Sequence, residues 1–420
     1  MKLLLKNATL IHEKSPFHNQ KKDVLVVDGM LSSIEDHIET EDAAKIELED
    51  LHLSSGWFDP SVSFGEPGYE ERETLSNGLI TAAKSGFTHI VLNPDTHPAL
   101  DSFTDVSHLL QNTNKYTTAL HVSASLSEGS KGTNLAPLFE MHKAGAVAFG
   151  DFNQTPENPN LLRIALDYVQ SFDGLIQAYP IDYSLSKNGQ MHEGEVSTHL
   201  GLKAIPNVAE TICLARDIQL LEYTQGRMHI PYLSSAESLE MIRTAKKKGL
   251  KISCSVPIAH LHATDENLID FDANFKIIPP LRSSKDQRAL REGLLDGTID
   301  MVTSLHQPLN PELKDLEFVR SKEGSVGLEA AFGILLNYFP LDKTIAFLTR
   351  GKAAFKIQDS GFEIGKMADF SLFTPKGSKT FDLSHLHSTS KNCLFLGSDI
   401  KGSVYGSLRG KSFQQNHLKY

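Results

Sequence analysis

The chain has 420 residues, of which 40% are hydrophobic and 22% are charged, so it is long enough to bury a large core and has an ordinary globular composition. The formal net charge of −11 at pH 7 disfavours binding to nucleic acid and to anionic membrane surfaces, because both need a basic face. Three widely spaced cysteines, Cys213, Cys254 and Cys393, fit neither a disulfide framework nor a thiolate zinc site, and we expect buried thiols.

The sequence also gives no sign of export or of membrane insertion. The apolar run at residues 3–5 is too short for a secretion signal. The longest apolar region, residues 328–341, is broken by Glu329, Asn337 and Pro340 and cannot cross a bilayer. A cytoplasmic location is therefore expected.

Residues 1–54 show the alternation of apolar and polar positions that is typical of β-strands. Asp28-Gly29 separates two strand-like runs, and this dipeptide favours a tight hairpin turn. We predict a small β unit here that is separate from the main body of the chain.

From residue 55 onward, apolar strand-like runs alternate with segments of helical spacing. Several helical segments end in glycine just before the next run, as expected at a helix C-terminus (Gly86, Gly145, Gly226, Gly249 and Gly297). Eight buried parallel strands with intervening helices predict a (β/α)₈ barrel over residues 55–364. An open doubly wound sheet is the alternative, but no Gly-x-Gly-x-x-Gly follows a strand. The eight runs are residues 57–64, 88–93, 120–126, 146–152, 175–179, 228–233, 252–256 and 299–305.

The stretch from Gly56 to Thr74 carries the main functional signal. It reads as an apolar strand that leads into the turn Glu66-Pro67-Gly68 and then into an acidic helix start. It resembles the Asp-x-His-x-His-Leu-Arg-Glu-Pro-Gly motif of long-type dihydroorotases in the amidohydrolase superfamily, with Asp59 and the Glu-Pro-Gly turn in place. Both histidines are replaced, by Ser61 and Ser63, and the substrate-binding arginine is replaced by Gly65.

The resemblance extends over nearly the whole chain. Residues 93–102 are similar to the family's Pro-Asn-Thr-x-Pro-x-x-Asp loop, with Asp95 at the position of a substrate-binding asparagine. Residues 193–206, 274–282, 296–300 and 390–397 also match. The resemblance implies that a β-rich tail, residues 365–420, returns to pair with residues 1–54 in one composite β-sandwich unit beside the barrel.

The resemblance further implies a zinc site, because zinc lowers the pKa of bound water to about 7 and supplies the hydroxide that opens a cyclic amide. Asp151 is retained at the metal-bridging position, but Gln177 and Tyr232 stand where the other histidine ligands are expected. Leu305 replaces the proton-shuttling aspartate, and only His306 and Pro308 of that motif survive. Substrate contacts at Gly65, Ala259 and Ile278 have also lost their polar groups.

Hydroxyl and amide groups do not replace imidazole as zinc ligands, and leucine carries no proton. We therefore expect an inactive dihydroorotase homologue without zinc or another cofactor. Non-catalytic homologues occur in the family beside an active paralogue. The resemblance implies a structural or regulatory partnership with aspartate transcarbamoylase in pyrimidine biosynthesis, and a homodimer. The positions placed at the barrel mouth are Asp59, Ser61, Ser63, Gly65, Glu66, Asp95, Asp151, Gln177, Tyr232, Ile278, Leu305 and His306.

Two other functions stay open. The chain is alternatively an active cyclic amide hydrolase that interconverts dihydroorotate and carbamoyl-aspartate, either with Asp151, Glu66 and Tyr232 as its acting groups or with zinc if ligands come from elsewhere. A small-molecule sensor that uses the emptied pocket is the third possibility. The pairs His260-x-His262 and His385-x-His387 are interpreted as structural, because no third ligand is spaced to complete a metal site.

Overall fold

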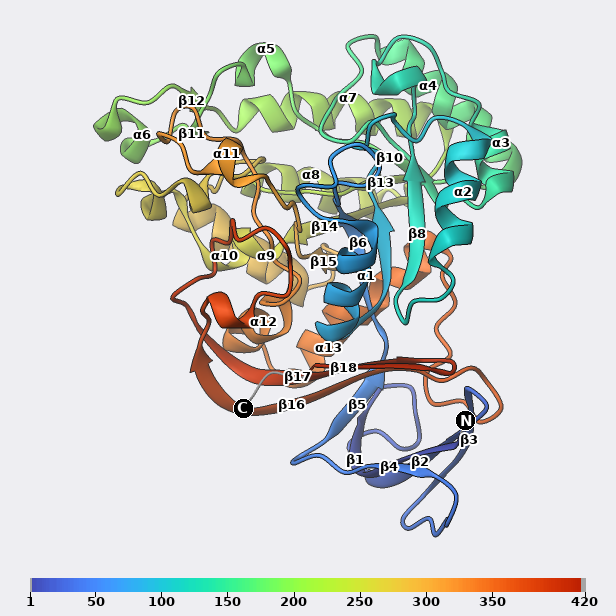
Figure 1. Ribbon diagram of the computed structural model, residues 1–420. Helices are drawn as coiled ribbons and strands as arrows, with labels where there is room; N and C mark the ends of the chain where they lie inside the picture. The colour runs from blue at the N-terminus through green and yellow to red at the C-terminus, as the bar shows by residue number, and fades with distance from the viewer. Residues whose placement is uncertain (1, 417–420) are drawn as a thin grey trace.

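The computed structural model describes residues 2–416, so residue 1 and residues 417–420 of the predicted β unit lie outside the described part of the chain. Eight strands form the barrel (Figure 1), and adjacent strands pair in parallel in the order in which they occur along the chain. They are β6 (Trp57–Val62), β7 (Phe87–Leu92), β8 (Ala119–Ala124), β9 (Ala148–Phe149), β10 (Ile176–Gln177), β13 (Met228–Ile230), β14 (Ile252–Pro257) and β15 (Met301–Thr303).

The first and last strands close the barrel. Ser63 N donates a hydrogen bond of 2.8 Å to His306 O, and Thr303 Oγ1 lies 3.0 Å from Ser61 O. Each of the eight predicted runs overlaps a barrel strand, which confirms the barrel and excludes the doubly wound alternative. Strands β9 and β10 are shorter than predicted, although single backbone bonds such as Gly150 N to Ala124 O, 2.9 Å, continue the pairing beyond them.

Helices surround the barrel and cover its strands (Figure 1). The longer ones are α1 (Leu75–Lys84), α2 (Phe103–Thr113), α3 (Leu138–Ala144), α4 (Pro159–Tyr168), α7 (Val208–Thr224), α8 (Ala236–Lys247), α10 (Ser284–Leu295), α12 (Ala331–Tyr338) and α13 (Leu341–Thr349). Short elements near the barrel mouth are α5 (Tyr183–Ser186), β11 (Met191–His192), α6 (Glu195–Leu200), β12 (Ala204–Ile205), α9 (Ile258–His262) and α11 (Pro311–Lys314). The 3₁₀ helices are η1 (Glu128–Ser130), η2 (Val169–Phe172), η3 (Asp265–Leu268), η4 (Ala273–Phe275), η5 (Arg350–Phe355) and η6 (Leu383–His385).

Glycines in the left-handed conformation follow four of the longer helices, α1, α3, α8 and α10, as predicted. Gly86, Gly145, Gly249 and Gly297 all have positive φ angles, which glycine adopts without a Cβ penalty. The prediction for Gly226 is wrong, because Gln225 takes the left-handed position at the end of α7 with φ 60° and donates to Leu221 O.

A second sheet lies below the barrel in Figure 1 and joins the two ends of the chain. Its order is β18-β17-β16-β5-β1-β2-β3, with β4 paired to β1, and β16 runs antiparallel to β5. Asp28 and Gly29, both with positive φ, form the predicted hairpin turn between β2 and β3. The strands are β1 (Lys2–Ile11), β2 (Lys21–Val27), β3 (Met30–Glu35), β4 (Ala44–Ile46), β5 (His52–Ser55), β16 (Asp369–Thr380), β17 (Asp399–Arg409) and β18 (Ser412–Gln415).

Trp57 joins the two sheets through aromatic packing. Its side chain is fully buried, stacks on Phe332 with ring centroids 5.0 Å apart, and contacts Phe87 and Phe373 at 5.9 and 5.6 Å. Its indole Nε1 donates to Ser54 Oγ at 2.9 Å, so the polar atom of this large apolar side chain is satisfied. The single tryptophan therefore packs β6 against β16 at the base of the barrel.

A buried charged cluster lies at the same junction. Asp369 Oδ2 is 3.0 Å from His89 Nε2 and 3.1 Å from Lys352 Nζ, and His89 Nδ1 is 3.0 Å from His121 Nε2. Burial by itself raises the pKa of Asp369, but Lys352 and His89 more than offset it, so that pKa lies well below its usual value. Asp369 is thus held as a carboxylate between the barrel and β16.

Two buried lysines fix the loop that follows α11 at the barrel mouth. Lys276 Nζ donates to the carbonyl oxygens of Phe318 and Ser321 at 2.8 and 2.7 Å. Lys314 Nζ donates to those of Lys276 and Gly324 at 3.1 and 2.9 Å. Burial lowers the pKa of Lys314 to about 7. These bonds satisfy the ammonium groups and hold the loop against the barrel.

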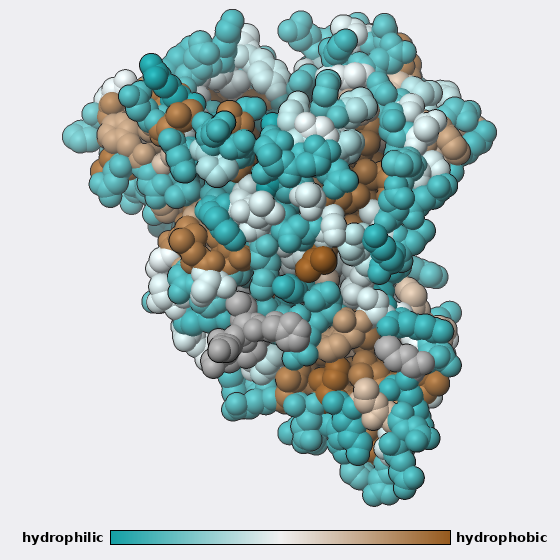
Figure 2. All heavy atoms as spheres, viewed as in Figure 1, coloured by the Kyte–Doolittle hydropathy of each residue, from teal (hydrophilic) through white to brown (hydrophobic). Residues whose placement is uncertain are grey.

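The surface and the thiols are unremarkable for a globular chain. Figure 2 shows hydrophilic side chains over most of the viewed face, with hydrophobic ones gathered mainly toward the lower end. Cys213, Cys254 and Cys393 are buried free thiols, as predicted. Within residues 2–416, no helix has the length and apolarity needed to span a membrane.

Candidate functional site

A cleft opens at the end of the barrel where β6, β7, β9 and β15 stop. Loops that follow these strands form its walls. Asn153 also borders two neighbouring pockets, so the three spaces meet at the barrel mouth. Side chains at the cleft include Ser63, Tyr69, Arg72, Asp95, Gln154, Gln307, Lys322 and Glu323.

A hydrogen-bonded network occupies the positions at which the family resemblance places metal ligands. Ser61 Oγ donates to Asn93 Oδ1 at 2.8 Å and lies 2.8 Å from the Tyr232 hydroxyl. Tyr179 reaches the same Asn93 oxygen at 3.3 Å, and Asn93 Nδ2 donates to Ser63 Oγ at 3.2 Å. Asn93, which the sequence analysis did not single out, is therefore the centre of this network.

The carboxylates of the two retained aspartates, Asp59 and Asp151, accept hydrogen bonds from backbone N–H groups. Asp59 accepts from Ser304 N at 2.8 Å and from Thr303 Oγ1 at 2.7 Å, which ties β6 to β15. Asp151 accepts from the backbone N–H groups of Leu126 and Ser127 at 2.9 and 3.0 Å, as well as from the Ser127 hydroxyl. Burial raises the pKa of both carboxyls. Neither is aimed at the cleft.

Three other predicted positions also lie inside the fold. Gln177 Oε1 accepts from Ser123 Oγ at 2.5 Å, and its Nε2 is buried without a partner. Leu305 is buried with φ 54°, a left-handed conformation that is unusual for leucine. His306 is fully buried, its Nε2 is 4.0 Å from Glu73 Oε2, and burial lowers its pKa to about 3, so the imidazole is neutral.

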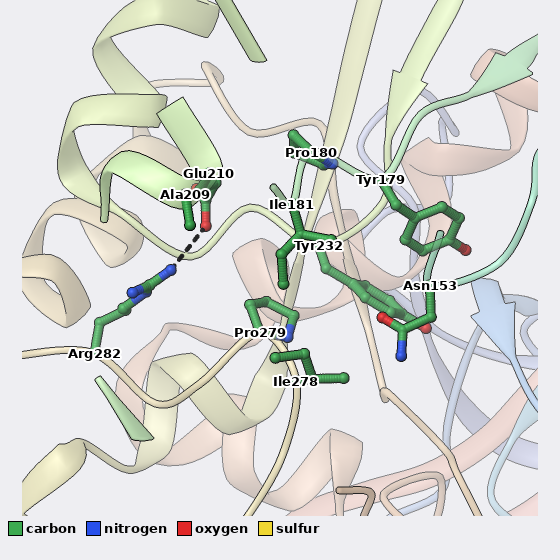
Figure 3. Close-up of a pocket in the computed structure, with 10 residues that line it drawn as sticks. All are labelled: Asn153, Tyr179, Pro180, Ile181, Ala209, Glu210, Tyr232, Ile278, Pro279 and Arg282. Carbon is green, nitrogen blue, oxygen red and sulfur yellow. Dashed lines mark ion pairs between the residues drawn. The ribbon is translucent and has the colours of Figure 1, made fainter. Parts of the chain in front are cut away.

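The remaining positions are structural or line a cavity. Glu66 Oε2 accepts from Leu75 N at 2.8 Å and thereby caps α1. Gly65 lies in a tight turn, where its carbonyl accepts from Tyr69 N at 2.7 Å. Ile278 lines the small pocket shown in Figure 3, with Tyr179, Tyr232 and Asn153 on one side and the Glu210–Arg282 ion pair on the opposite side.

These residues do not fit a zinc pair. In the part of the chain that the structure describes, no group of three His, Cys, Asp or Glu side chains is placed to hold a metal ion. The donors at the family positions are hydroxyl, phenol and amide groups that are already bonded to one another, and the two carboxylates are bonded to the backbone. The expectation that the chain uses no zinc stays a prediction.

Asp95 differs from the other carboxyls because it lines the cleft and one of its oxygens has no hydrogen-bond partner. Its Oδ1 is buried without a hydrogen-bond partner. Burial raises its pKa to about 6, although a hydrogen bond with Ser63 and the positive charge of Arg72 act in the opposite direction. A carboxyl that titrates near neutrality in a cleft is suited to general acid–base work.

Arg72 is the functional candidate that the sequence analysis missed. It lines the same cleft as Asp95 and stands four residues after the Glu-Pro-Gly turn. The sequence signal for it is a cationic residue that follows the altered motif so closely. The paired histidines are structural: His260 Nε2 contacts Pro280 O at 3.1 Å, and His262 contacts Ser398 Oγ at 2.9 Å.

We expect Tyr232→Phe to lower the free energy of unfolding by about 1 kcal/mol, because it removes one buried hydrogen bond to Ser61 while Asn93 still accepts from that hydroxyl. Burial raises the pKa of Tyr232 above the ordinary tyrosine value, so the phenol keeps its proton at neutral pH. The substitution therefore removes a hydrogen bond and does not remove a base. Urea unfolding measures the effect. Tyr223→Phe, at a side chain 75% exposed, is the matched control and should change nothing; an equal loss in both variants would contradict the network.

Comparison with known proteins identifies the family. Residues 52–238 match the family model described as dihydro-orotase-like. A dihydroorotase from Pelotomaculum thermopropionicum is 35% identical over 417 residues, covering 98% of this chain and 97% of the relative, and one from Syntrophotalea carbinolica is 34% identical with 96% of each covered. The fold is similar to L-hydantoinase (dihydropyrimidinase) from Arthrobacter aurescens, with TM-score 0.86, 18% identity, and 100% and 97% of the two chains covered.

These relatives overturn one prediction. The prediction that the chain is an inactive structural partner of aspartate transcarbamoylase is wrong. Full-length relatives at 34–35% identity are named dihydroorotase and support an active enzyme. That prediction depended only on the residue types at the positions of the family's metal ligands. The match over almost the full length of relatives at 34–35% identity shows that the chain belongs to the dihydroorotase family.

Proposed function

We propose that this chain hydrolyses a cyclic amide of the dihydroorotate type, and closes the same ring in reverse, with Asp95 as its general base. Asp95 carries the proposal, because it lines the cleft, its buried Oδ1 has no hydrogen-bond partner, and burial raises its pKa to about 6. The match over almost the full length of chains named dihydroorotase supports the substrate class.

In the proposed reaction, the Asp95 carboxylate accepts a proton from a water molecule in the cleft. The water oxygen forms a bond to the ring carbonyl carbon, the ring C–N bond breaks, and the Asp95 carboxyl returns the proton to the leaving nitrogen. The products are a carboxylic acid and an open-chain ureido group, and ring closure is the reverse. A base with a pKa near the working pH is efficient in such steps and contributes about 10²–10⁴-fold.

Ser63 orients this base. Its hydroxyl bonds to Asp95 and also accepts from Asn93 Nδ2 at 3.2 Å, so the polar network beneath the cleft fixes the direction of the carboxyl. Asp151, Glu66 and Tyr232 have no part in the proposed step, because the first two carboxylates are bonded to the backbone and the phenol is bonded to Ser61. The polar network takes the place that histidine ligands have in the family motif.

The test is ring opening of dihydroorotate by the purified chain, followed by ultraviolet absorbance in both directions. We expect turnover by the wild type and by the control variant Asp315→Asn, whose carboxyl is exposed on the loop after α11. Absence of turnover from a folded wild-type protein at every pH between 5 and 9 would reject the proposal. The partnership with aspartate transcarbamoylase and the homodimer stay untested predictions.

A further inference from the structure

The segment between β16 and β17 leaves the second sheet and returns to it as a closed loop, residues 382–397, which we call the C-terminal loop. Its ends are joined, because Phe381 N donates to Ser398 O and Gly397 N donates to Phe381 O, both at 2.8 Å. In Figure 1 this loop, in red, rises from the second sheet alongside the barrel. Compact loops whose ends lie close together frequently carry function.

Two carboxylates of the barrel hold three consecutive backbone N–H groups of the C-terminal loop. His387 N and Ser388 N donate to Glu329 Oε1 at 3.1 and 2.9 Å. Thr389 N donates to Glu73 Oε2 at 3.1 Å, and the Glu73 side chain is fully buried. Hydrogen bonds to an ionised acceptor are stronger than those between neutral groups, so this part of the loop is fixed on the barrel.

Beyond these anchors, Asn392 binds the backbone of the loop that follows β15. Its Nδ2 donates to Gln307 O at 2.9 Å and to Gly324 O at 3.1 Å, and its Oδ1 accepts from Leu309 N at 3.1 Å. Residues 307–310 form neither helix nor strand, so their buried backbone groups depend on such partners. Asn392 therefore joins both ends of the loop after β15.

Ser390 joins that loop to the one after β6. Its hydroxyl oxygen lies 2.7 Å from Arg72 O and 2.8 Å from Leu309 O. Arg72, Gln307 and Leu309 all line the cleft, and the bonds from the C-terminal loop reach their backbones. A segment of the second sheet thus fixes one wall of the cleft in the barrel.

We propose that Ser390 and Asn392 are positioning residues for the ring-opening reaction, which hold this wall of the cleft and thereby set the affinity for the cyclic amide. Asp95 lies on the loop after β7, and the bonds of Ser390 and Asn392 go to the loops after β6 and β15. Loss of these bonds should therefore weaken substrate binding and leave the proton-transfer step nearly unchanged. The inference rests on the proposed function for its substrate.

Steady-state kinetics with dihydroorotate test the assignment. Asn392→Asp keeps an acceptor for Leu309 N but loses the two donated bonds, and we expect KM to rise about tenfold with kcat within about twofold of wild type. Ser390→Ala should also raise KM, and Ser390→Thr, which keeps the hydroxyl, should restore it. The matched control is Asn337→Asp, because Asn337 Nδ2 donates to Asp399 O at 2.6 Å between α12 and β17, and its KM should not change.

Hydrogen exchange gives a readout that needs no turnover. The amides of residues 307–310 should exchange faster in Asn392→Asp and at the wild-type rate in Asn337→Asp. The amides of residues 93–102, on the loop that carries Asp95, should be unaffected in both variants. Calorimetric titration with dihydroorotate should show the same weakening as KM.

An unchanged KM in Asn392→Asp, a fall in kcat as large as the rise in KM, or an equal rise in KM in Asn337→Asp would overturn the positioning role. If Asn392→Asp does not fold, Ser390→Ala against Ser390→Thr decides by the same split. The two proposals fail separately. Weaker dihydroorotate binding by Asn392→Asp in a chain without turnover would reject only the proposed activity, and turnover with unchanged KM would reject only the positioning role.

Discussion

Asp95→Asn is expected to lower the rate of dihydroorotate ring opening by about 10²–10⁴-fold, the range that a positioned general base contributes. The amide keeps the size of the carboxyl but accepts no proton. In the wild type, kcat/KM should rise with pH up to about 6 and then level off, because the carboxylate form is the active one and burial raises its pKa to about 6. The variant should lose this pH-dependent step.

The same substitution is expected to stabilise the fold at pH 7. The pKa of Asp95 is about 6 in the folded chain against an ordinary value of 3.8, so the folded state holds the proton more tightly. Stability contributed by the protonated group is complete below pH 3.8 and is lost as pH rises through 6. Asn stays neutral, and we expect a gain on the order of 1 kcal/mol at pH 7, discounted because the residue is partly exposed.

Urea unfolding at pH 4 and pH 8, beside steady-state kinetics, measures both effects. The stability difference between Asp95→Asn and wild type should be small at pH 4 and larger at pH 8. Asp315→Asn is the matched control for both measurements. A variant that keeps at least half of the wild-type turnover would show that Asp95 is not the base, whatever its effect on stability.

Asp369→Asn should cost about 3–5 kcal/mol of folding free energy, the usual loss when one partner of a buried ion pair is removed. Asp369 is 2% exposed and contacts Lys352 and His89. Without it, His89 would lose its carboxylate partner and Lys352 would keep only Asp359 Oδ1, at 3.6 Å. Because its folded pKa lies below the ordinary value, the stability it contributes is present above about pH 4 and lost as pH falls.

Urea unfolding from pH 3 to pH 7 checks this expectation. The wild type should lose its advantage over Asp369→Asn as the pH is lowered, while the two should differ most at pH 7. Asp36→Asn is the control, because Asp36 pairs with Lys22 at a side chain 88% exposed. A loss below about 1 kcal/mol at pH 7 would mean that the cluster contributes little to holding β16 on the barrel.

The barrel was predictable because its strands are buried on both sides. Residues 252–256 are apolar or small throughout, and residues 57–64 are so apart from Asp59. The first run covers all of β14 but its last residue, and the second covers all of β6. Local conformation was harder to predict where either of two neighbouring residues could take the left-handed position at the end of a helix. At the end of α7, Gln225 takes that position and Gly226 does not. Contacts between distant segments, such as His89 with Asp369, leave no local pattern in the sequence.

The candidate site was predictable in position but not in chemistry. The resemblance placed Ser61, Asp95 and Asp151 together at the barrel mouth. Every departure from the family pattern was then interpreted as a loss of catalytic function. Residue type alone does not tell a carboxyl that is bonded to the backbone, as in Asp151, from one with an unused oxygen, as in Asp95. Arg72 likewise depends on how the turn after Gly65 folds.

The most direct test of the account is dihydroorotate turnover by protein that has been stripped of metal with a chelator, compared with the same protein after zinc is added back. The account predicts ring opening by the stripped protein, at a rate that zinc leaves unchanged and that Asp95→Asn lowers about 10²–10⁴-fold. Turnover that appears only with zinc, or no turnover in either preparation, would contradict it.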